Sequence, residues 1–423
     1  MVKHSKSKDH EKNNGEKLED KQKKQAKNII VFPIFIIGFI IILLSIISII
    51  FPGLIISIAG DSEFIEPFEM GTMGLPLIIV NIIVFSLIIL HFNHNLPNSI
   101  TKSIQRIFSF DISQKYSLVF LGIILASYIA ISVNELSVYE LNQYGDFRTV
   151  ERAIEIWPNG ESKNVYVTEQ LDRHVRMALL VASEEIFHNV KVIPYLASIF
   201  LLIVTYFLTI KFSKKNFTGL ISVVLVLQSS TFYIYDTIAV YENFWVLFYV
   251  FSIYLIFKKP KISPVFYILS IFSKAIIVLW FPISILVTIL SDIPSKTKIF
   301  VLIAHIITII ISLIIFQYSD SVYQNVIDIE PSEFWIGFTT LAFNLRFDVV
   351  LLLLLLPVTA GLFLKARKGD KNSISLIVLI CGTILVTPIL EMITNYYFVY
   401  PYRYVPLVVF FAIGLSTLFS KTK

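Results

Sequence analysis

The sequence has little of what a soluble enzyme commonly uses. Its one cysteine, Cys381, stands in an apolar run, so an intrachain disulfide is impossible. Charged residues make up only 15% of the chain. There is no Walker loop, no GxGxxG and no GxSxG motif, so soluble nucleotide chemistry has no evident place. The seven histidines show no ligand spacing such as HExxH, and His174 by itself indicates no metal site.

Long hydrophobic runs dominate the chain instead. Of its 423 residues 56% are hydrophobic, and the mean hydropathy is +0.77. Many runs approach or exceed the ~20 residues that cross ~30 Å of hydrocarbon. Within lipid the backbone must satisfy its own hydrogen bonds, so these runs are expected to be helices. Runs such as IIGFIIILLSIISII do not alternate as barrel strands do. We predict an all-α, polytopic transmembrane bundle of about 11–13 helices.

The charge pattern predicts how the chain is organised. Residues 1–28 carry nine Lys and five acids and are expected to form a disordered cytoplasmic tail. Residues 29–115 should form two extra helices, at about 29–50 and 75–92, and a basic connector. A main domain follows over 116–419, with external loops at 135–176 and 317–346. Positive connectors mark the cytoplasmic side, so both termini are expected there. No internal repeat is evident.

Basic connectors alternate with connectors that lack lysine along the chain. This pattern gives about twelve membrane crossings if two conditions hold. Residues 262–291 must form a hairpin of two short helices broken near Ser273–Lys274, and 176–190 must be an interfacial segment. The short loops and the Ile/Lys-rich composition favour a prokaryotic cell membrane. The net charge of +5 comes mostly from loop and tail lysines, which indicates orientation and not nucleic-acid binding.

The loop at 135–176 is the most polar stretch after the tail. Asp146 in YGDFR could take a proton from an acceptor hydroxyl, orient that hydroxyl, or help to hold a metal ion. A solvated loop acid is an equally good interpretation. The next run, FRTVERAIEIW, has an apolar face and is expected to lie as an amphipathic helix in the headgroup plane. That face consists of Phe147, Val150, Ile154 and Trp157.

A cluster of cations follows in DRHVR. Arg173, His174 and Arg176 could pair with a lipid phosphate, for which arginine forks are geometrically suited. Ordinary anchoring at the membrane surface explains the same residues equally well.

Several ionisable groups stand in or beside apolar helices. Glu242 and Lys274 would each cost several kcal/mol in hydrocarbon unless paired or facing a wet cavity, so a functional role is the default. Glu242 could simply pair with Lys274, and Lys274 could instead be a snorkelling lysine at a hairpin tip. Tyr402 and Arg403 in YPYRY are expected at the external start of the last helix. There, the arginine could meet an anionic headgroup or Glu391.

The order of these features over about 116–419 resembles the GT-C superfamily of polytopic glycosyltransferases, which includes protein O-mannosyltransferase-like and aminoarabinose-transferase-like enzymes. Asp146 with FRTVERAIEIW resembles the family's first external loop, which has an essential Asp followed by amphipathic helices. SSTFYIYDTIAVYENFWVLFYVFSIYLIFK is similar to a helix, acidic turn and Phe-rich helix of the family, and places Glu242 at the acidic position. Ser273–Lys274 resembles a T-K break, and RYVP at 403–406 a closing R-Y-x-x-P segment.

The resemblance implies transfer of a sugar from a polyprenyl-phosphate donor to a lipid, glycan or protein acceptor on the external face. It assigns Asp146 as base or orienting group and Glu242 as a helper. The candidate donor-phosphate ligands are Arg148, Arg173, His174, Arg176, Lys274, Tyr402 and Arg403. No cofactor is required, although a divalent metal ion could take part.

Two other classes of function remain open at this point. A transporter or lipid flippase shares the many crossings and the buried charge, and a proton symporter should stop transporting when its intramembrane acid is neutralised. A non-catalytic scaffold predicts that Asp146→Asn has no effect.

Overall fold

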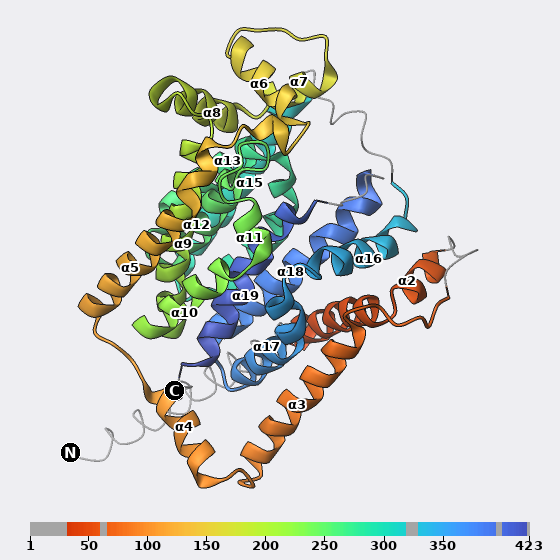
Figure 1. Cartoon of the computed structure of the whole chain (residues 1–423), viewed down its shortest axis with the longest axis vertical. Coiled ribbons are helices and arrows are strands. Elements are labelled where there is room, and N and C mark those ends of the chain that lie inside the picture. Colours follow the sequence, from red (N-terminus) through yellow and green to blue (C-terminus); the bar gives the residue numbers. More distant parts are fainter. Residues whose placement is uncertain (1–31, 60–65, 319–328, 395–399, 421–423) are drawn as a thin grey trace, which may run out of the picture.

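The computed structural model describes residues 32–59, 66–318, 329–394 and 400–420, and these contain helices and no strand (Figure 1). The predicted cytoplasmic tail at 1–28 lies outside them. Within these ranges, eight helices are long and apolar enough to cross a membrane, as expected of a multi-pass membrane protein. Their bounds are Phe32–Ile50, Gly74–His91, Gln114–Ser137, Val192–Ser213, Ser295–Gln317, Val349–Arg367, Lys371–Thr394 and Pro401–Leu418.

Other apolar runs of the described residues are divided into shorter helices, so the count of about 11–13 helices stays a prediction. Three such helices have 10–17 residues: Asn216–Leu227, Phe244–Lys258 and Ala275–Leu290. From the N-terminal side, the elements are α2 (Pro52–Ala59), α3 (Gly74–Phe92), α4 (Asn98–Ser109), α5 (Gln114–Ser132), η1 (Val133–Ser137), η2 (Glu140–Asn142), α6 (Phe147–Ile156), α7 (Val165–Leu171) and α8 (His174–Phe187). The following elements are α9 (Val192–Ser213), α10 (Asn216–Leu227), α11 (Ser230–Ile234), α12 (Phe244–Lys258), η3 (Pro260–Ile262), α13 (Ser263–Ser273), η4 (Ala275–Trp280) and α14 (Phe281–Leu290). The last are α15 (Ser295–Tyr318), α16 (Glu333–Leu345), α17 (Val349–Arg367), α18 (Lys371–Thr394), η6 (Pro401–Tyr404) and α19 (Val405–Leu418).

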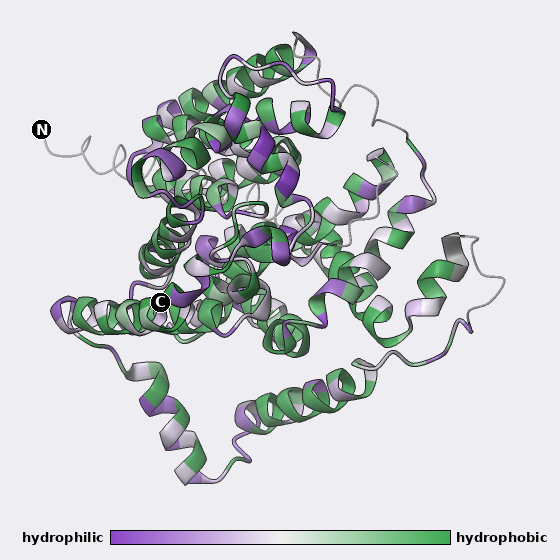
Figure 2. Ribbon diagram, turned by 45° about the horizontal axis from the view of Figure 1, so that its top comes forward, coloured by the Kyte–Doolittle hydropathy of each residue, from purple (hydrophilic) through white to green (hydrophobic). Residues whose placement is uncertain are grey.

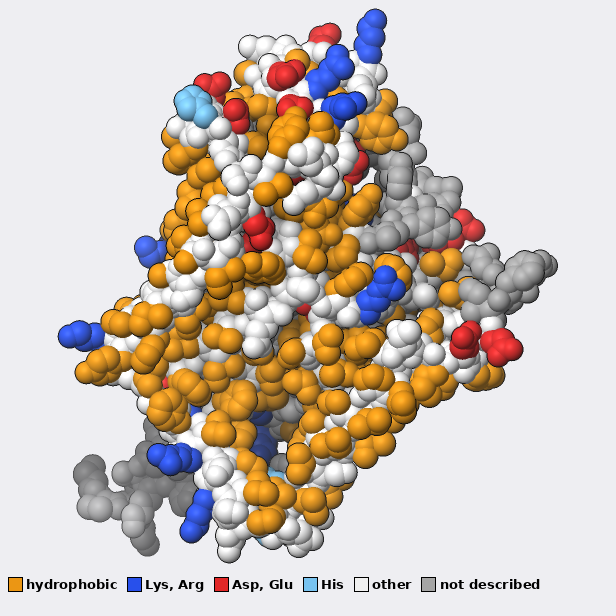
Figure 3. Space-filling view, viewed as in Figure 1, with side chains coloured by type: hydrophobic (Ala, Val, Ile, Leu, Met, Phe, Trp, Pro, Cys, Tyr) orange, Lys and Arg blue, Asp and Glu red, His pale blue; other side chains and the backbone are white. Residues whose placement is uncertain are grey.

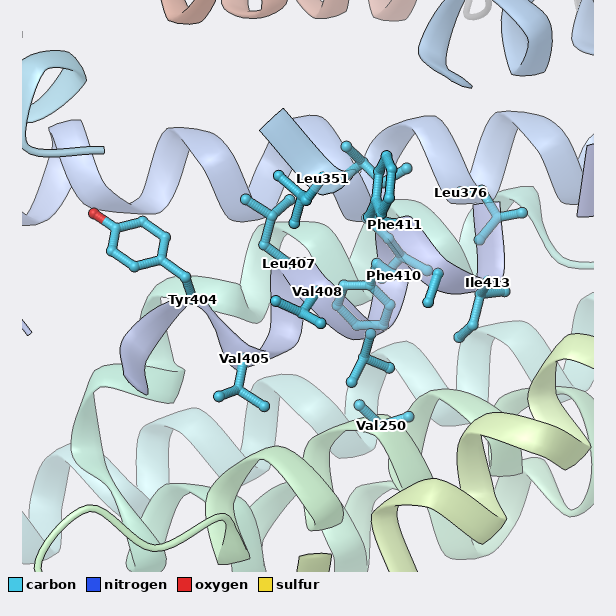
Figure 4. Close-up of a cluster of buried hydrophobic side chains, with 14 of the residues drawn as sticks. Val250, Leu351, Leu376, Tyr404, Val405, Leu407, Val408, Phe410, Phe411 and Ile413 are labelled. Carbon is cyan, nitrogen blue, oxygen red and sulfur yellow. The ribbon is translucent and has the colours of Figure 1, made fainter. Parts of the chain in front are cut away.

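The core of the bundle surrounds α19, whose apolar residues are almost all buried (Figure 4). Helices α9, α10, α17 and α18 pack against it. The outer helices have the opposite character, because only 11% of the α3 window and 22% of the α15 window is buried. Their exposed side chains are apolar, so the surface is hydrophobic along much of its height (Figures 2 and 3). Lipid is the solvent that suits such a surface.

Basic connectors meet at one end of the bundle. Lys215 Nζ donates to the carbonyl oxygens of Phe108 (2.6 Å) and Phe419 (3.2 Å), and Lys365 Nζ donates to that of Thr417 (2.8 Å). The segment with α6, α7 and α8 lies at the opposite end (Figure 1). Basic connectors are expected on the cytoplasmic side, so this separation fits termini in the cytoplasm and the polar loop outside. The orientation itself stays a prediction.

The predicted reversal at Ser273–Lys274 is confirmed. Helix α13 ends at Ser273, Lys274 is extended, and the chain resumes as η4 and α14. Tyr267 Oη donates to the carbonyl oxygen of Ile277 (3.0 Å), so the second arm runs back along the first. The expected interfacial segment is α8, whose 14 residues are too few for a full span.

Two predictions about the loops need correction. The prediction of one long loop over 317–346 is wrong for its second half. There, EFWIGFTTLAFNL forms α16, which packs on α18 and α2. Residues 319–328 of that loop lie outside the described parts of the chain. In the first loop, α6 forms as expected, but Phe147 and Val150 are buried against other protein segments and do not face lipid.

Candidate functional site

The centre of the site is an irregular segment, residues 235–243, between α11 and α12. Every residue in it is buried, so its backbone polar groups need partners within the protein. Glu140 supplies one set of partners, because its carboxylate accepts from the backbone N–H groups of Ala239 (2.9 Å) and Val240 (2.7 Å). Burial raises the pKa of Glu140, whereas these two N–H groups lower it. We call residues 235–243 the clamped loop.

Arg176 binds the clamped loop from the other side. Its Nη2 donates to the carbonyl oxygens of Ala239 and Val240, both at 3.0 Å, and its Nε donates to Glu242 Oε2 at 2.9 Å. Nη1 donates to Gln170. The side chain is 1% exposed, and all three guanidinium nitrogens are used within the protein. The predicted role of Arg176 at a lipid phosphate is therefore replaced by a structural one. Glu242 pairs with Arg176, not with Lys274 as one interpretation had it.

Asp146 lies directly before α6 and has an exposed side chain. Its Oδ2 accepts a hydrogen bond from Tyr241 Oη at 2.8 Å, across 95 positions of sequence. Tyr241 belongs to the clamped loop and is only 7% exposed. Burial first, and then the hydrogen bond to Asp146, raise the pKa of Tyr241, so the phenol stays protonated and donates. A solvent-accessible carboxylate is thus oriented by a buried hydroxyl.

Tyr241 connects this carboxylate with two cations. Its ring stacks on that of Tyr402, with centroids 4.6 Å apart and planes 21° apart. Tyr402 Oη accepts from Lys274 Nζ at 2.9 Å and from Arg403 Nε at 3.1 Å. We call Tyr241 and Tyr402 the aromatic bridge. Four separate segments therefore meet here: the loop before α6, the clamped loop, the tip of the α13–η4 hairpin and η6.

The other predicted site residues lie apart from this hydrogen-bonded cluster. Arg148 is exposed on α6. Arg173 forms an ion pair with Glu169. His174 is also exposed, and its ring centroid is 6.0 Å from that of Phe272. Of the nine predicted residues, the structure brings together Asp146, Lys274, Tyr402 and Arg403.

The sequence analysis did not single out Glu140, Tyr241 or Tyr128, and Tyr128 is the hydrogen-bond partner of the buried Asp236. Asp236 is 1% exposed, its Oδ2 accepts from Tyr128 Oη at 2.6 Å, and burial raises the pKa of Asp236 to about 7. Glu140 had one available signal, namely an acid in the polar loop. Tyr241 resembled an ordinary interfacial tyrosine, and only its position next to Asp146 distinguishes it.

A hollow of about 440 Å³ lies beside the site. It is bounded by η1, η2, α6 and the last turn of α8, and Phe147 in its wall directly follows Asp146. Glu151, Glu155, Glu184 and His188 also line it, so it suits a polar ligand. Among the described residues, no three His, Cys, Asp or Glu side chains are grouped to hold a metal ion. Divalent metal therefore stays an untested prediction.

Comparison of the chain with protein-family models, with curated proteins and with solved structures finds no match.

Proposed function

We propose that this protein is a membrane glycosyltransferase that moves a sugar from a polyprenyl-phosphate donor to a hydroxyl of a lipid, glycan or protein acceptor. The observation that carries the proposal is the aromatic bridge. It joins an exposed carboxylate, Asp146, to a site where two cations, Lys274 and Arg403, donate to one phenol oxygen. In the proposed orientation this end of the bundle faces the outside of a prokaryotic cell.

The arrangement suits an inverting displacement. Asp146 takes the proton of the acceptor hydroxyl as its oxygen forms a bond to the anomeric carbon. The bond between that carbon and the phosphate oxygen breaks, and its electron pair leaves with the polyprenyl phosphate. Lys274 and Arg403 stabilise the negative charge that develops on this leaving group. Tyr241 holds the Asp146 carboxylate in place, and Glu140 and Arg176 hold the loop that carries Tyr241.

The proposal is tested with purified wild-type protein, Asp146→Asn, and Glu161→Gln as a matched control. Glu161 is an exposed acid in the same loop and has no part in the cluster. Release of polyprenyl phosphate is measured from a panel of polyprenyl-phospho-sugars, with membrane lipid extract as acceptor. Wild type and Glu161→Gln should turn over, and Asp146→Asn should lose ~10²-fold or more, the usual size of a general-base effect. Melting profiles establish that each variant is folded.

Two outcomes contradict the proposal in different ways. Equal turnover by Asp146→Asn and wild type would show that Asp146 is not the general base. A non-catalytic scaffold also predicts that this substitution has no effect. No turnover by wild type with any donor, including lipids from the host membrane, excludes the transferase. In that case transport of the same lipids across vesicle membranes would favour a flippase.

A further inference from the structure

Two helix breaks lie side by side in the bundle. One separates α10 from α11 at Gln228–Ser229, and the other separates α16 from α17 at 346–348. Ser230 Oγ donates to the carbonyl oxygen of Phe347, which joins the two breaks. Between them is a hollow of about 130 Å³, whose wall combines the apolar Leu225, Phe347, Val350 and Phe411 with the polar Gln228 and Asp348. Phe347 and Val350 are 43% and 40% exposed, so the hollow reaches the surface.

Arg346 stands at this break with its side chain exposed. Its Cζ lies 3.4 Å from the ring centroid of Phe343 and 4.8 Å from that of Phe347. No acid forms a salt bridge with Arg346 in the parts of the chain that the structure describes. Asp348, the nearest acid in sequence, is only 5% exposed. The guanidinium is therefore fixed by two aromatic rings, while its N–H edges have no anionic partner from those residues.

The depth of Arg346 indicates what could pair with it. The apolar span of α17 begins three positions later, at Val349, and has 19 residues. At 1.5 Å per residue this is about 28 Å, close to the thickness of the hydrocarbon layer. If α17 crosses the hydrocarbon over this length, Arg346 falls where hydrocarbon gives way to lipid phosphates. The exposed residues beside it include the apolar Phe343 and Val349, at 43% and 49% exposure.

We propose that Arg346 and the adjoining hollow bind one anionic phospholipid. The guanidinium pairs with the phosphate through two parallel N–H···O bonds, a geometry that arginine offers and lysine does not. The hollow of about 130 Å³ takes a short part of one acyl chain, and the rest of the chain extends into the bilayer. The site is independent of the proposed transferase reaction. Cation–π contacts support it, because they hold the guanidinium plane in one orientation before the lipid arrives.

Native mass spectrometry of the full-length protein in detergent tests this directly. Phosphatidylglycerol and phosphatidylcholine of equal chain length are the probes. Wild type should retain one phosphatidylglycerol in preference to phosphatidylcholine, and Arg346→Gln should weaken that binding about tenfold or more, as loss of charged hydrogen bonds does. The matched control is Arg152→Gln, which removes an exposed arginine on α6 and should bind like wild type.

A second variant tests the hollow without removing the charge. Val350→Trp fills the space with a bulky ring, and it should also weaken phosphatidylglycerol binding. Glycerol 1-phosphate, which has the phosphate but no chains, should fail to displace the lipid. The proposal is overturned by unchanged lipid binding in folded Arg346→Gln, by equal retention of the two lipids in wild type, or by displacement with glycerol 1-phosphate. Unchanged phosphatidylglycerol binding by Val350→Trp would overturn the assignment of the acyl chain to this hollow.

Discussion

Arg176 Nε donates to Glu242 Oε2 over 2.9 Å, and both side chains are 1% exposed. The two residues come from different segments, α8 and the clamped loop, and lie 66 positions apart. A buried pair of this kind is a weak source of net stability, but breaking it from one side leaves an uncompensated charge. Together with Glu140, the pair therefore fixes the position of the clamped loop.

We predict that Arg176→Met destabilises the protein by about 3–5 kcal/mol, the usual cost of leaving a buried charge unpaired. The measurement is the melting temperature in detergent, which should fall clearly. The double variant Arg176→Met with Glu242→Leu should recover part of the loss, because it removes both charges. A double variant no more stable than Arg176→Met would contradict the pairing.

Glu140→Gln should also destabilise the clamped loop. The amide of glutamine has one acceptor oxygen, so the N–H of Ala239 or Val240 loses its partner, at a cost of about 1–3 kcal/mol. Glu155→Gln, an exposed acid on α6, serves as the control and should melt like wild type. If the two variants melt at the same temperature, the carboxylate of Glu140 does not support this loop.

Stability should depend on pH through Asp236. Its pKa is raised from 3.8 to about 7, so between these values the folded protein holds a proton that the unfolded chain has lost. The free energy of unfolding therefore falls as pH rises from about 4 to about 7, and the contribution of this group is constant above that. The full effect is at most about 4 kcal/mol. In Asp236→Asn this fall in melting temperature should be absent, and an unchanged profile would assign it to another group.

Tyr241→Phe should lower turnover by about tenfold if the transferase proposal holds. The variant keeps the ring that stacks on Tyr402 but loses the hydroxyl that donates to Asp146, and one such hydrogen bond is worth about 1–1.5 kcal/mol. Tyr195→Phe is a suitable control, since Tyr195 is also buried in an aromatic cluster but does not contact Asp146. Full activity of Tyr241→Phe would show that the hydroxyl does not position the carboxylate.

Lys274→Met and Arg403→Gln should each lower release of polyprenyl phosphate by ~10²-fold, a typical loss for one group that stabilises developing negative charge. Both cations donate to Tyr402 Oη, so their effects should not add in the double variant. Lys274→Met should remain folded, because replacing a buried charge with an apolar side chain of similar volume is often tolerated. Strict additivity would show that the cations act at separate places.

The sequence by itself determined the class of this protein and much of its local structure. Hydropathy predicts the membrane helices, because a backbone in hydrocarbon has to satisfy its own hydrogen bonds. The same reasoning located the helix now seen as α3, the start of α5, the amphipathic α6 and the chain reversal at Lys274. These features depend on neighbouring residues only. The apolar α16 was missed because polar residues before it led us to treat the whole of 317–346 as one loop.

Only the tertiary structure decided which charged groups meet. Glu140 reaches backbone N–H groups about a hundred positions away, and Lys274 reaches Tyr402 across 128. A hydrophobic pattern records how buried a residue tends to be, but it carries no information on its partner across the bundle. From the sequence, Asp146 was the candidate base, Glu242 a candidate helper, and Arg176, Lys274 and Arg403 were all candidate phosphate ligands. Packing then separated the pair that holds the clamped loop from the carboxylate and cations that the aromatic bridge brings together.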